Sequence, residues 1–341
     1  MDLADFDYDL PAAAIAQGPP ETRDGGRLLV IERAGNGLDD RRVIDLPSLL
    51  RAGDCLVVND SRVIPARVLA EDVEGRPVEL LFVEPVTEGA WRAMVRPGRR
   101  CRPGAHLRAG GVRLRVIAAE DDGTRLIARE GGSITALLDT VGMPPLPPYI
   151  ARHAKPAPED WERYQTVYAR TPGSVAAPTA GLHLSDPLLA RLRAAGVQVH
   201  SITLHVGPAT FRPIKTATIE AHTLPPERAV VSPATADALN TVRAEGRRVV
   251  AVGTTVTRTL ESAVGDDGRV APLDGAASIY IQPGHRFRAV DALLTNFHLP
   301  RSSLLVLVAA FAGRERILRA YLHAIAAGYR FYSYGDATLI G

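Results

Sequence analysis

Histidines, hydroxyls and small residues recur at four places in this sequence where a loop lies between a predicted strand and a predicted helix or just before a helix. The segments are 177–183, 205–207, 253–255 and 295–303, and they contain three histidines and a Gly-Thr-Thr sequence. Histidine exchanges a proton near neutral pH. Small residues and hydroxyls after a strand allow close approach of a carboxylate or a ribose. The pattern therefore predicts a site for a small polar ligand, with histidine available for acid–base chemistry.

Two helix–strand units position these segments. The sequence "SDPLLARLRAAG" has Ser185 or Asp186 as a cap, Pro187 in its first turn and helical apolar spacing, and the strand-like "VQVHSITLHV" follows it. The sequence "SPATADALNTVRAEG" repeats this pattern from Ser232 and leads into the strand-like "RRVVAVG". Two such units with short loops predict a partly parallel α/β sheet. Because ligands bind beyond the carboxyl ends of strands in such sheets, all four segments are expected to line one crevice.

Each of these residues also has a purely structural interpretation. A single histidine near a strand end is commonly a hydrogen-bonded structural residue, and Gly-Thr-Thr is compatible with a simple turn. Glu261 would pair with Arg258 on one helix face, because the two are three residues apart. Asp60 would form an Asx turn, and Asp336 would cap or turn the chain. Only the shared position of the segments at strand ends favours a site.

The middle of the chain has a different pattern. From about residue 67 to residue 129, short β-like runs such as "VELLFVE" and "GVRLRVIAAE" alternate with Gly and Pro turns, which predicts a small antiparallel barrel or sandwich. A proline-rich connector follows. The early runs "RLLVIE" and "DCLVVND" resemble the later α/β part, and a helix-rich segment at 302–327 is apolar enough to pack on its sheet. We therefore expect a discontinuous α/β domain of residues 1–65 and 151–341 with an inserted β-barrel domain of residues 66–150.

Composition narrows the function classes. The 341 residues are 46% hydrophobic and 23% charged, as in a globular protein of about two domains. The start lacks the features of a signal peptide and the apolar runs are too short to span a membrane, so a cytoplasmic protein is expected. Cys55 and Cys101 lie in unrelated contexts, and neither a disulfide framework nor a metal site is predicted. The absence of GxSxG, HExxH, GxGxxG and Walker sequences counts against the corresponding enzyme classes.

Positive charge is concentrated in one stretch, although the net charge is only +2. No acidic residue occurs between residues 92 and 115, where the arginines are Arg92, Arg96, Arg99, Arg100, Arg102, Arg108, Arg113 and Arg115. This arginine field suits a phosphate backbone. A solvated, arginine-rich surface is the alternative interpretation.

A series of sequence blocks, in order from end to end, resembles the S-adenosylmethionine:tRNA ribosyltransferase-isomerase family of queuosine biosynthesis. The blocks are "FDYDLP", "IAQGPPETRDGGRLLV", "GDCLVVNDSRVIPAR", "PPYI", "ERYQTVYA", "GSVAAPTAGLH", "LHVG", "TFRP", "VGTT", "RTLES", "DALLTNFHLPRSSLL" and "YRFYSYGDATLI". The resemblance implies the same architecture, an α/β domain with an inserted β-barrel. It also implies transfer and isomerisation of the ribosyl group of S-adenosylmethionine onto 7-aminomethyl-7-deazaguanine at the tRNA wobble position, giving epoxyqueuosine-tRNA, adenine and methionine.

The resemblance also implies which partners to expect. S-adenosylmethionine is a consumed co-substrate, so no cofactor is expected, and the tRNA would carry a GUN-type anticodon with the deazaguanine precursor. No membrane association is expected, and we expect a monomer. The alternatives are a divergent relative that uses S-adenosylmethionine with another amine acceptor, and a catalytically weakened tRNA-binding protein.

The implied reaction has recognisable chemical requirements. The sulfonium acidifies the ribose C5′ protons, so a base must remove one, adenine must be helped to leave, and the amine of the RNA is the nucleophile. On the matching positions, the expected catalytic residues are His183 and His205 as acid or base, Glu261 as orienter or base, and His298 for polar orientation. The expected substrate-binding residues are Thr179, Gly181, Gly207, Thr210, His222, Glu227, Thr254, Thr255, Arg258 and Asn296. The expected tRNA-binding residues are Arg96, Arg99, Arg100 and Arg102, and no metal ligand is expected.

The chain departs from the family pattern mainly within the expected site. Pro225 and Pro226 stand where the pattern has a histidine and a serine, and proline lacks even a backbone N–H. There are five further departures. Ala209 stands where the pattern has glycine, Val256 where it has serine, and Leu184 where it has an aromatic residue. Ala277 and Ser278 stand where it has threonine and an acidic residue. Because of these departures, both alternative functions remain open, namely an enzyme with another amine acceptor and a catalytically weakened tRNA-binding protein.

Overall fold

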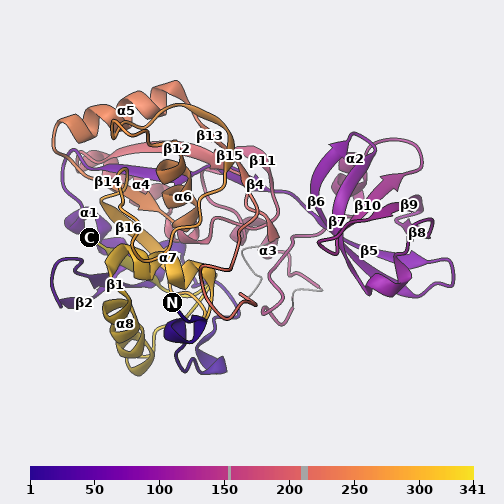
Figure 1. Ribbon diagram of the computed structural model, residues 1–341, viewed down its shortest axis with the longest axis horizontal. Coiled ribbons are helices and arrows are strands. Elements are labelled where there is room, and N and C mark those ends of the chain that lie inside the picture. Colours follow the sequence, from indigo (N-terminus) through magenta and orange to yellow (C-terminus); the bar gives the residue numbers. More distant parts are fainter. Residues whose placement is uncertain (153–154, 209–213) are drawn as a thin grey trace. The chain divides into compact units, whose positions relative to one another are not determined.

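The structure is a computed structural model that describes residues 1–152, 155–208 and 214–341 (Figure 1). Its described residues divide into two compact units. An α/β unit comprises Met1–Ser61, Gln165–Thr171 and Ala177–Gly341, and a barrel unit comprises Arg62–Tyr164 and Pro172–Ala176. The connector after residue 150 thus groups with the barrel as far as Tyr164, beyond the expected boundary. Between the units the chain passes through two short paired strands, β4 (Ser61–Val63) and β11 (Thr171–Ser174).

The α/β unit is built on a nine-stranded, partly parallel sheet, as the sequence predicts. The strands in spatial order are β15 (Leu273–Ala277), β13 (Glu227–Val231), β12 (Gln198–Leu204), β3 (Cys55–Asn59), β14 (Val249–Val252), β16 (Ala292–Asn296), β17 (Ala337–Ile340), β1 (Arg27–Ile31) and β2 (Leu38–Arg42). The central strands β12, β3, β14 and β16 run parallel to one another. Strands β13 and β17 run antiparallel to their neighbours β12 and β16.

Local signals in the sequence fix the helices that flank this sheet. Helix α4 (Asp186–Ala194) begins where the Ser185 side chain accepts a hydrogen bond from the Leu188 N–H, and α5 (Pro233–Ala244) begins with the same contact from Ser232. Proline in the first turn fits both starts. The helix-rich end of the chain forms α7 (Ser303–Ala312) and α8 (Arg314–Ala326). The predicted helix–strand units are confirmed.

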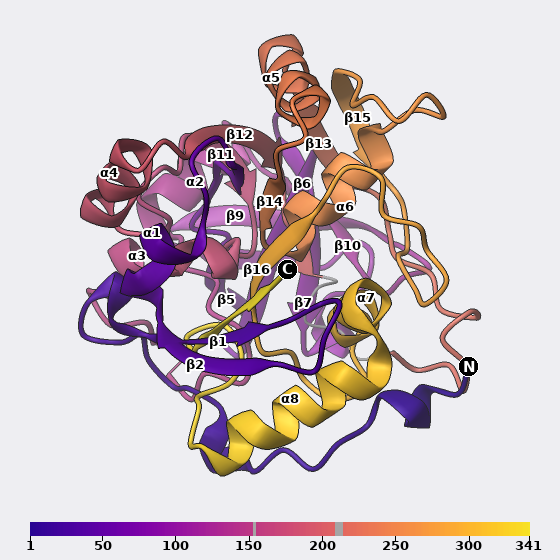
Figure 2. The same cartoon turned by 90° about the vertical axis from the view of Figure 1, so that its left-hand side faces the viewer.

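Helices cover both faces of the sheet. One face buries a continuous apolar cluster against α1 (Leu46–Leu49), α4 and the 3₁₀ turn η6 (Thr179–His183). Figure 2 shows α1 and α4 on one side of the sheet and α6 (Thr254–Ala263) and α7 on the other, while α8 runs beside the β1–β2 edge. A contact between His323 Nε2 and Asp40 Oδ2, at 2.9 Å, links α8 to that edge.

The barrel unit is a closed antiparallel barrel, which confirms the predicted inserted domain. Its strands, in order around the barrel, are β10 (Arg125–Arg129), β7 (Ala90–Arg96), β6 (Pro77–Thr87), β5 (Arg67–Asp72), β8 (His106–Ala109) and β9 (Val112–Ala119). Alternate residues point inward and form an apolar core, to which α2 (Ile134–Val141) contributes. A second short helix, α3 (Asp160–Arg163), lies in the connector, where buried Asp160 binds Arg152 at 2.6 Å. Cys55 and Cys101 are free and buried, as expected of structural thiols.

Parallel strand directions bring the ends of β3, β12, β14 and β16 to one edge, which we call the carboxyl edge. Strands β13 and β17 are antiparallel to their neighbours, so each begins at this edge. The residues that follow β3, β12, β14 and β16 therefore meet the residues that precede β13 and β17 at this edge. This is the position at which ligands bind in α/β sheets.

Candidate active site at the carboxyl edge of the sheet

The segments predicted to line one crevice do converge at the carboxyl edge. Asn296, at the end of β16, lies 3.1 Å from His183 at the end of η6 (Asn296 Nδ2 to His183 Nε2). A Cβ placed on Gly253, at the end of β14, would lie 3.5 Å from the Ala180 Cβ. The segment after β12 meets the start of β13, where Gly207 N–H donates to Glu227 at 2.9 Å. Thr210 lies outside the described residues.

His183 is buried, at 3% exposure, and its ring is held as a hydrogen-bond acceptor. Asn296 Nδ2 donates to His183 Nε2 and to the carbonyl oxygen of Tyr332, the latter at 3.2 Å. An amide nitrogen has no lone pair to accept with, so this arrangement selects the neutral imidazole with its proton on Nδ1. Burial lowers the pKa of His183 to about 4, and the nearby Asp336 carboxylate opposes that shift only in part. His183 is thus a neutral group at physiological pH.

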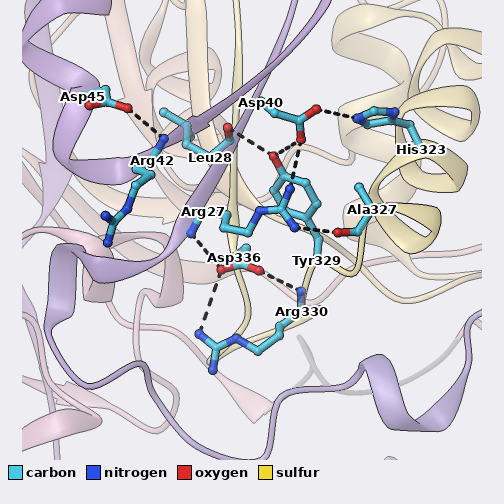
Figure 3. Close-up of polar contacts among 10 residues, drawn as sticks. All are labelled: Arg27, Leu28, Asp40, Arg42, Asp45, His323, Ala327, Tyr329, Arg330 and Asp336. Atoms are coloured by element: carbon cyan, nitrogen blue, oxygen red, sulfur yellow. Dashed lines mark hydrogen bonds and ion pairs between the residues drawn. The ribbon is translucent and has the colours of Figure 1, made fainter.

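Asp336 fastens two chain segments beside His183 (Figure 3). Its carboxylate accepts from the N–H of Arg27, at 2.9 Å, and from the N–H of Arg330, at 2.8 Å. A Cβ placed on Gly26 would lie 3.5 Å from Asp336 Oδ1 and 3.6 Å from His183 Nδ1, so the two side chains border the same glycine. Asp336 therefore does more than turn its own chain, because it ties the start of β1 to the loop before β17.

His298 is a buried structural residue at the same edge. Its Nε2 lies 3.1 Å from the Thr295 hydroxyl, and its backbone N–H donates to the Tyr321 hydroxyl at 3.1 Å. Burial lowers the pKa of His298 to about 3. These contacts engage its Nε2 and its backbone N–H within the fold, and the lowered pKa keeps the ring uncharged near neutral pH.

Glu261 is an anchor for the segment that precedes β16. Its carboxylate, fully buried, accepts from the N–H groups of the three consecutive residues Arg288, Ala289 and Val290. His285 Nε2 lies 3.2 Å from Glu261 Oε2. The interpretation that Glu261 pairs with Arg258 on the helix surface is wrong, because both side chains are buried and each binds a different partner. Both oxygens of the Glu261 carboxylate are committed within the fold, so the expectation that it acts as a base gains no support from its contacts.

Arg258 forms a buried ion pair with Glu227. Arg258 Nη1 lies 2.5 Å from Glu227 Oε2, and the two side chains are 8% and 7% exposed. Arg258 also donates to the carbonyl oxygens of Ile279 and Ala277, at 3.1 and 3.4 Å. Together with the Gly207 contact, the pair ties α6 to the ends of β12, β13 and β15. Arg258 is therefore committed within the protein, and the expectation that it binds a ligand carboxylate gains no support from its contacts.

His205 differs from the other two histidines. It is half-buried, and its Nδ1 is buried without a hydrogen-bond partner among the described residues. Burial and the Arg228 guanidinium lower its pKa, while the Asp60 carboxylate acts in the opposite direction. His205 therefore has a ring nitrogen that is free to exchange a proton with a ligand.

Asp60 is a residue whose importance sequence reasoning missed. It follows β3, which lies between β12 and β14 in the sheet. Asp60 Oδ1 accepts from the Thr203 hydroxyl and Oδ2 accepts from Arg170 Nη2, each at 2.6 Å. It is more than an Asx turn, since it places a buried negative charge at the centre of the carboxyl edge. The signal was available, because "DCLVVND" reads as a strand that ends in polar residues.

The threonines after β14 open helix α6 at this edge. Gly253 is the cap, with φ of 98°, a conformation that favours glycine, and no side chain caps the first turn. The first N–H groups of α6 thus have no side-chain acceptor among the described residues. Thr254 is buried and Thr255 is half-buried, while Thr179 is the first residue of η6. His222 is half-buried and packs edge-on against the Tyr280 ring at 5.4 Å.

The departures from the family pattern fall into two structural groups. Leu184, Val256 and Ala277 are fully buried, so these apolar residues fill the core. Pro225, Pro226 and Ser278 are exposed, and Ala209 lies outside the described residues. The buried departures affect packing, and the exposed ones change only what the surface offers to a partner.

The arginine field lies on the barrel unit and is divided between engaged and free side chains. Arg92 pairs with Glu84, and Arg100 donates to the Pro77 carbonyl oxygen at 2.7 Å. Arg96, Arg99 and Arg102 are exposed, and none of them forms an ion pair with another described residue. On the β8–β9 hairpin, Arg108 faces Arg113 directly. Like charges in that position are destabilising, so an anionic partner would relieve them.

The described residues contain neither a helix that could cross a membrane nor a cluster of metal-ligating side chains. None of their helices combines the length and the apolar character needed to cross a membrane. No group of three or more His, Cys, Asp or Glu side chains among them is arranged to hold a metal ion.

A partly parallel sheet with convergent polar groups at its carboxyl edge, and a barrel inserted in the chain, defines an α/β enzyme architecture. The sequence pattern of the family described as "Queuosine biosynthesis protein" matches residues 3–340. The chain belongs to this queuosine biosynthesis protein family.

Individual relatives match the whole chain. The S-adenosylmethionine:tRNA ribosyltransferase-isomerases of Anaeromyxobacter dehalogenans (strain 2CP-C) and Moorella thermoacetica (strain ATCC 39073 / JCM 9320) are 52% and 50% identical to it. Both alignments cover all of this chain, with 99% and 100% of the respective relative. The crystal structure of S-adenosylmethionine tRNA ribosyltransferase from Thermotoga maritima is 34% identical, with a TM-score of 0.57 over 99% of this chain and 100% of that one. These findings confirm the resemblance seen in the sequence.

Proposed function

We propose that this chain transfers and isomerises the ribosyl group of S-adenosylmethionine onto the aminomethyl group of 7-aminomethyl-7-deazaguanine at the tRNA wobble position. The products are epoxyqueuosine-tRNA, adenine and methionine. The observation that carries this proposal is the full-length match, at about half identity, to relatives that bear the name of this activity. The polar groups gathered at the carboxyl edge supply a place for the reaction.

His205 is the residue that we assign to proton transfer. The reaction requires a base for the C5′ proton beside the sulfonium, and His205 has a buried ring nitrogen to which the described residues give no partner. His183 is the weaker choice, because Asn296 already occupies its Nε2 and burial keeps its pKa near 4. We assign His183 to orientation of the site as a neutral group.

The N-terminus of α6 is the part of the site that we assign to a polar end of S-adenosylmethionine. Its first N–H groups have no side-chain cap, and Thr254 and Thr255 place hydroxyls beside them. Backbone N–H groups at a helix start favour a carboxylate or ribose oxygens. This assignment moves carboxylate recognition away from Arg258, whose guanidinium is paired with Glu227.

The second substrate is a tRNA with a GUN-type anticodon that carries the deazaguanine precursor. Of the four arginines proposed for its backbone, Arg96, Arg99 and Arg102 are exposed and unpaired among the described residues, which favours them over Arg100. S-adenosylmethionine is consumed as a co-substrate, and the enzyme works as a monomer without a bound cofactor.

Product release tests the proposal. The protein is incubated with S-adenosylmethionine, with and without precursor-bearing tRNA, and adenine and methionine are followed by chromatography. Release that requires tRNA supports the proposal. Release without tRNA, or only with a small amine, would indicate a different acceptor, and tRNA binding without release would indicate a weakened tRNA-binding protein. In the same assay, unchanged adenine release by His205→Gln would discard the assignment of His205.

A further inference from the structure

Tyr168 has a buried hydroxyl for which the described residues provide no hydrogen-bond partner. Two other buried tyrosines are partnered: the Tyr329 hydroxyl donates to Asp40 at 2.5 Å, and the Tyr321 hydroxyl accepts from the His298 N–H. Leaving a buried hydroxyl unpaired costs stability, since the group loses its water and gains nothing in return. An unpaired hydroxyl that persists in a folded protein therefore calls for an explanation.

The Tyr168 hydroxyl lies within the candidate site. A Cβ placed on Gly181 would lie 2.2 Å from the hydroxyl oxygen, so the tyrosine packs directly on that glycine. A Cβ placed on Gly253, the cap of α6, would lie 3.5 Å from the Cβ of the adjacent Ala180. Gly181, on which Tyr168 packs, is thus the next residue after the one at which η6 approaches α6. Gly181 had been expected to serve substrate binding, and its lack of a side chain makes room for Tyr168.

A second unpaired hydroxyl lies at the same place. Thr166 is buried, its hydroxyl also lacks a partner among the described residues, and its methyl group would lie 2.9 Å from a Cβ on Gly181. Two residues of "QTVYA", each with a hydroxyl that lacks a partner among the described residues, thus pack against one glycine of the site. A single orphan group could be an accident of packing, but two at one position indicate a place for a polar ligand.

The Tyr168 hydroxyl is available as a donor. Burial raises its pKa, so the proton remains in place at neutral pH. The Asp60 carboxylate and the Arg23 guanidinium are close enough to influence it. Both are committed elsewhere, because Asp60 binds Thr203 and Arg170 and Arg23 donates to the Gln165 carbonyl oxygen at 2.7 Å.

We propose that Tyr168 is a substrate-contacting residue whose hydroxyl donates a hydrogen bond to bound S-adenosylmethionine. This inference rests on the proposed function and adds a residue to it. The ligand supplies the missing acceptor, so the free protein carries the cost of the unpaired hydroxyl and binding removes it. Removing the Tyr168 hydroxyl should consequently lower the affinity for S-adenosylmethionine and raise the stability of the free protein.

Tyr168→Phe tests this inference, since it removes one oxygen and preserves the ring. S-adenosylmethionine binding is measured by calorimetry, and the melting temperature is measured without ligand. We expect affinity to fall about tenfold, as for the loss of a buried hydrogen bond, while the melting temperature of the free protein rises. Thr166→Val should change both quantities in the same directions, with a smaller loss of affinity.

Tyr329→Phe is the matched control. It also removes a buried tyrosine hydroxyl from the α/β unit, but that hydroxyl is bonded to Asp40. The expected result is the reverse, a lower melting temperature with unchanged affinity for S-adenosylmethionine.

The outcomes separate this inference from the proposed function. If the wild-type protein binds S-adenosylmethionine and Tyr168→Phe binds it equally well, the assignment of Tyr168 is overturned and the proposed function stands. Unchanged affinity with a lower melting temperature would overturn it as well, and would show a hydroxyl that serves the fold. A wild-type protein that neither binds nor consumes S-adenosylmethionine would overturn the proposed function and this assignment together.

Discussion

Arginine has different roles at the carboxyl edge and in the arginine field of the barrel unit. At the edge, Arg258 is buried, paired with Glu227 and bonded to two carbonyl oxygens. On the barrel, Arg99 and Arg102 are exposed, and neither is paired with a described residue. A buried guanidinium must be satisfied by the fold, whereas an exposed one is satisfied by water until an anion replaces it. Burial therefore separates a structural arginine from one that is available to a ligand.

The same comparison identifies the groups that remain free at the carboxyl edge. Most of its buried polar groups have hydrogen-bond partners in other segments of the chain. Glu261 accepts from the backbone of Ala289, and Asp336 accepts from the backbone of Arg27 and Arg330. Four atoms without partners among the described residues are His205 Nδ1, the Tyr168 and Thr166 hydroxyls and Asn296 Oδ1. The edge thus offers a few fixed contacts, and the barrel offers a diffuse positive field. Substitutions should have large, local effects at the edge and small, cumulative effects on the barrel.

The largest expected effect on stability is at β13, where two neighbouring residues form ion pairs, one buried and one exposed to solvent. Glu227→Ala leaves Arg258 buried without its partner, and we expect the free energy of unfolding to fall by about 3–5 kcal/mol. Arg228→Ala, on the same strand, breaks a pair with Asp274 whose side chains are 63% and 68% exposed, and should cost less than about 1 kcal/mol. Urea unfolding measures both. Equal losses would show that burial does not distinguish the two pairs.

A smaller effect is expected from pH at the edge. His183 and His298 have folded-state pKa values of about 4 and about 3, below the unfolded value of about 6.5. The unfolded state therefore binds protons first, so the stability is fully present above pH 6.5 and is lost as the pH falls toward 4. Each histidine contributes about 1.4 kcal/mol per pH unit in that window. Urea unfolding between pH 7.5 and 4.5 measures the slope. His183→Gln should reduce it, and an unchanged slope would contradict a buried neutral His183.

Sequence reasoning found the positions of the site residues better than their roles. Helix caps, strand runs and the carboxyl-edge rule depend on local sequence, and they placed His183, His205 and Asn296 correctly. The roles of Arg258 and Glu261 depend on partners far away in the chain, namely Glu227 and the segment 288–290. Side-chain spacing along one helix suggested that the two bind each other, but it cannot reveal that both point into the interior. Tyr168 was missed because an unpaired hydroxyl exists only in the packed structure.

The barrel side of the comparison predicts a smaller, salt-dependent effect. Arg99→Gln and Arg102→Gln should each weaken tRNA binding and reduce the slope of log affinity against log salt concentration by about 1, as for one phosphate contact. Affinity for S-adenosylmethionine should not change. Filter binding at several salt concentrations measures the slope. Arg92→Gln is the matched control from the same field, since Arg92 is paired with Glu84 and should affect the slope less.

The smallest effect on stability is expected where the sequence departs most from its family. Pro225 and Pro226 are exposed, so replacing them with the histidine and serine of the family pattern removes no buried contact. The double variant Pro225→His, Pro226→Ser should change the free energy of unfolding by no more than about 0.5 kcal/mol. Its adenine release with precursor-bearing tRNA is the informative measurement, because stability is held nearly constant. An unchanged rate of adenine release would show that the two prolines are neutral surface substitutions next to Glu227. A faster rate would show that this loop contacts the substrate.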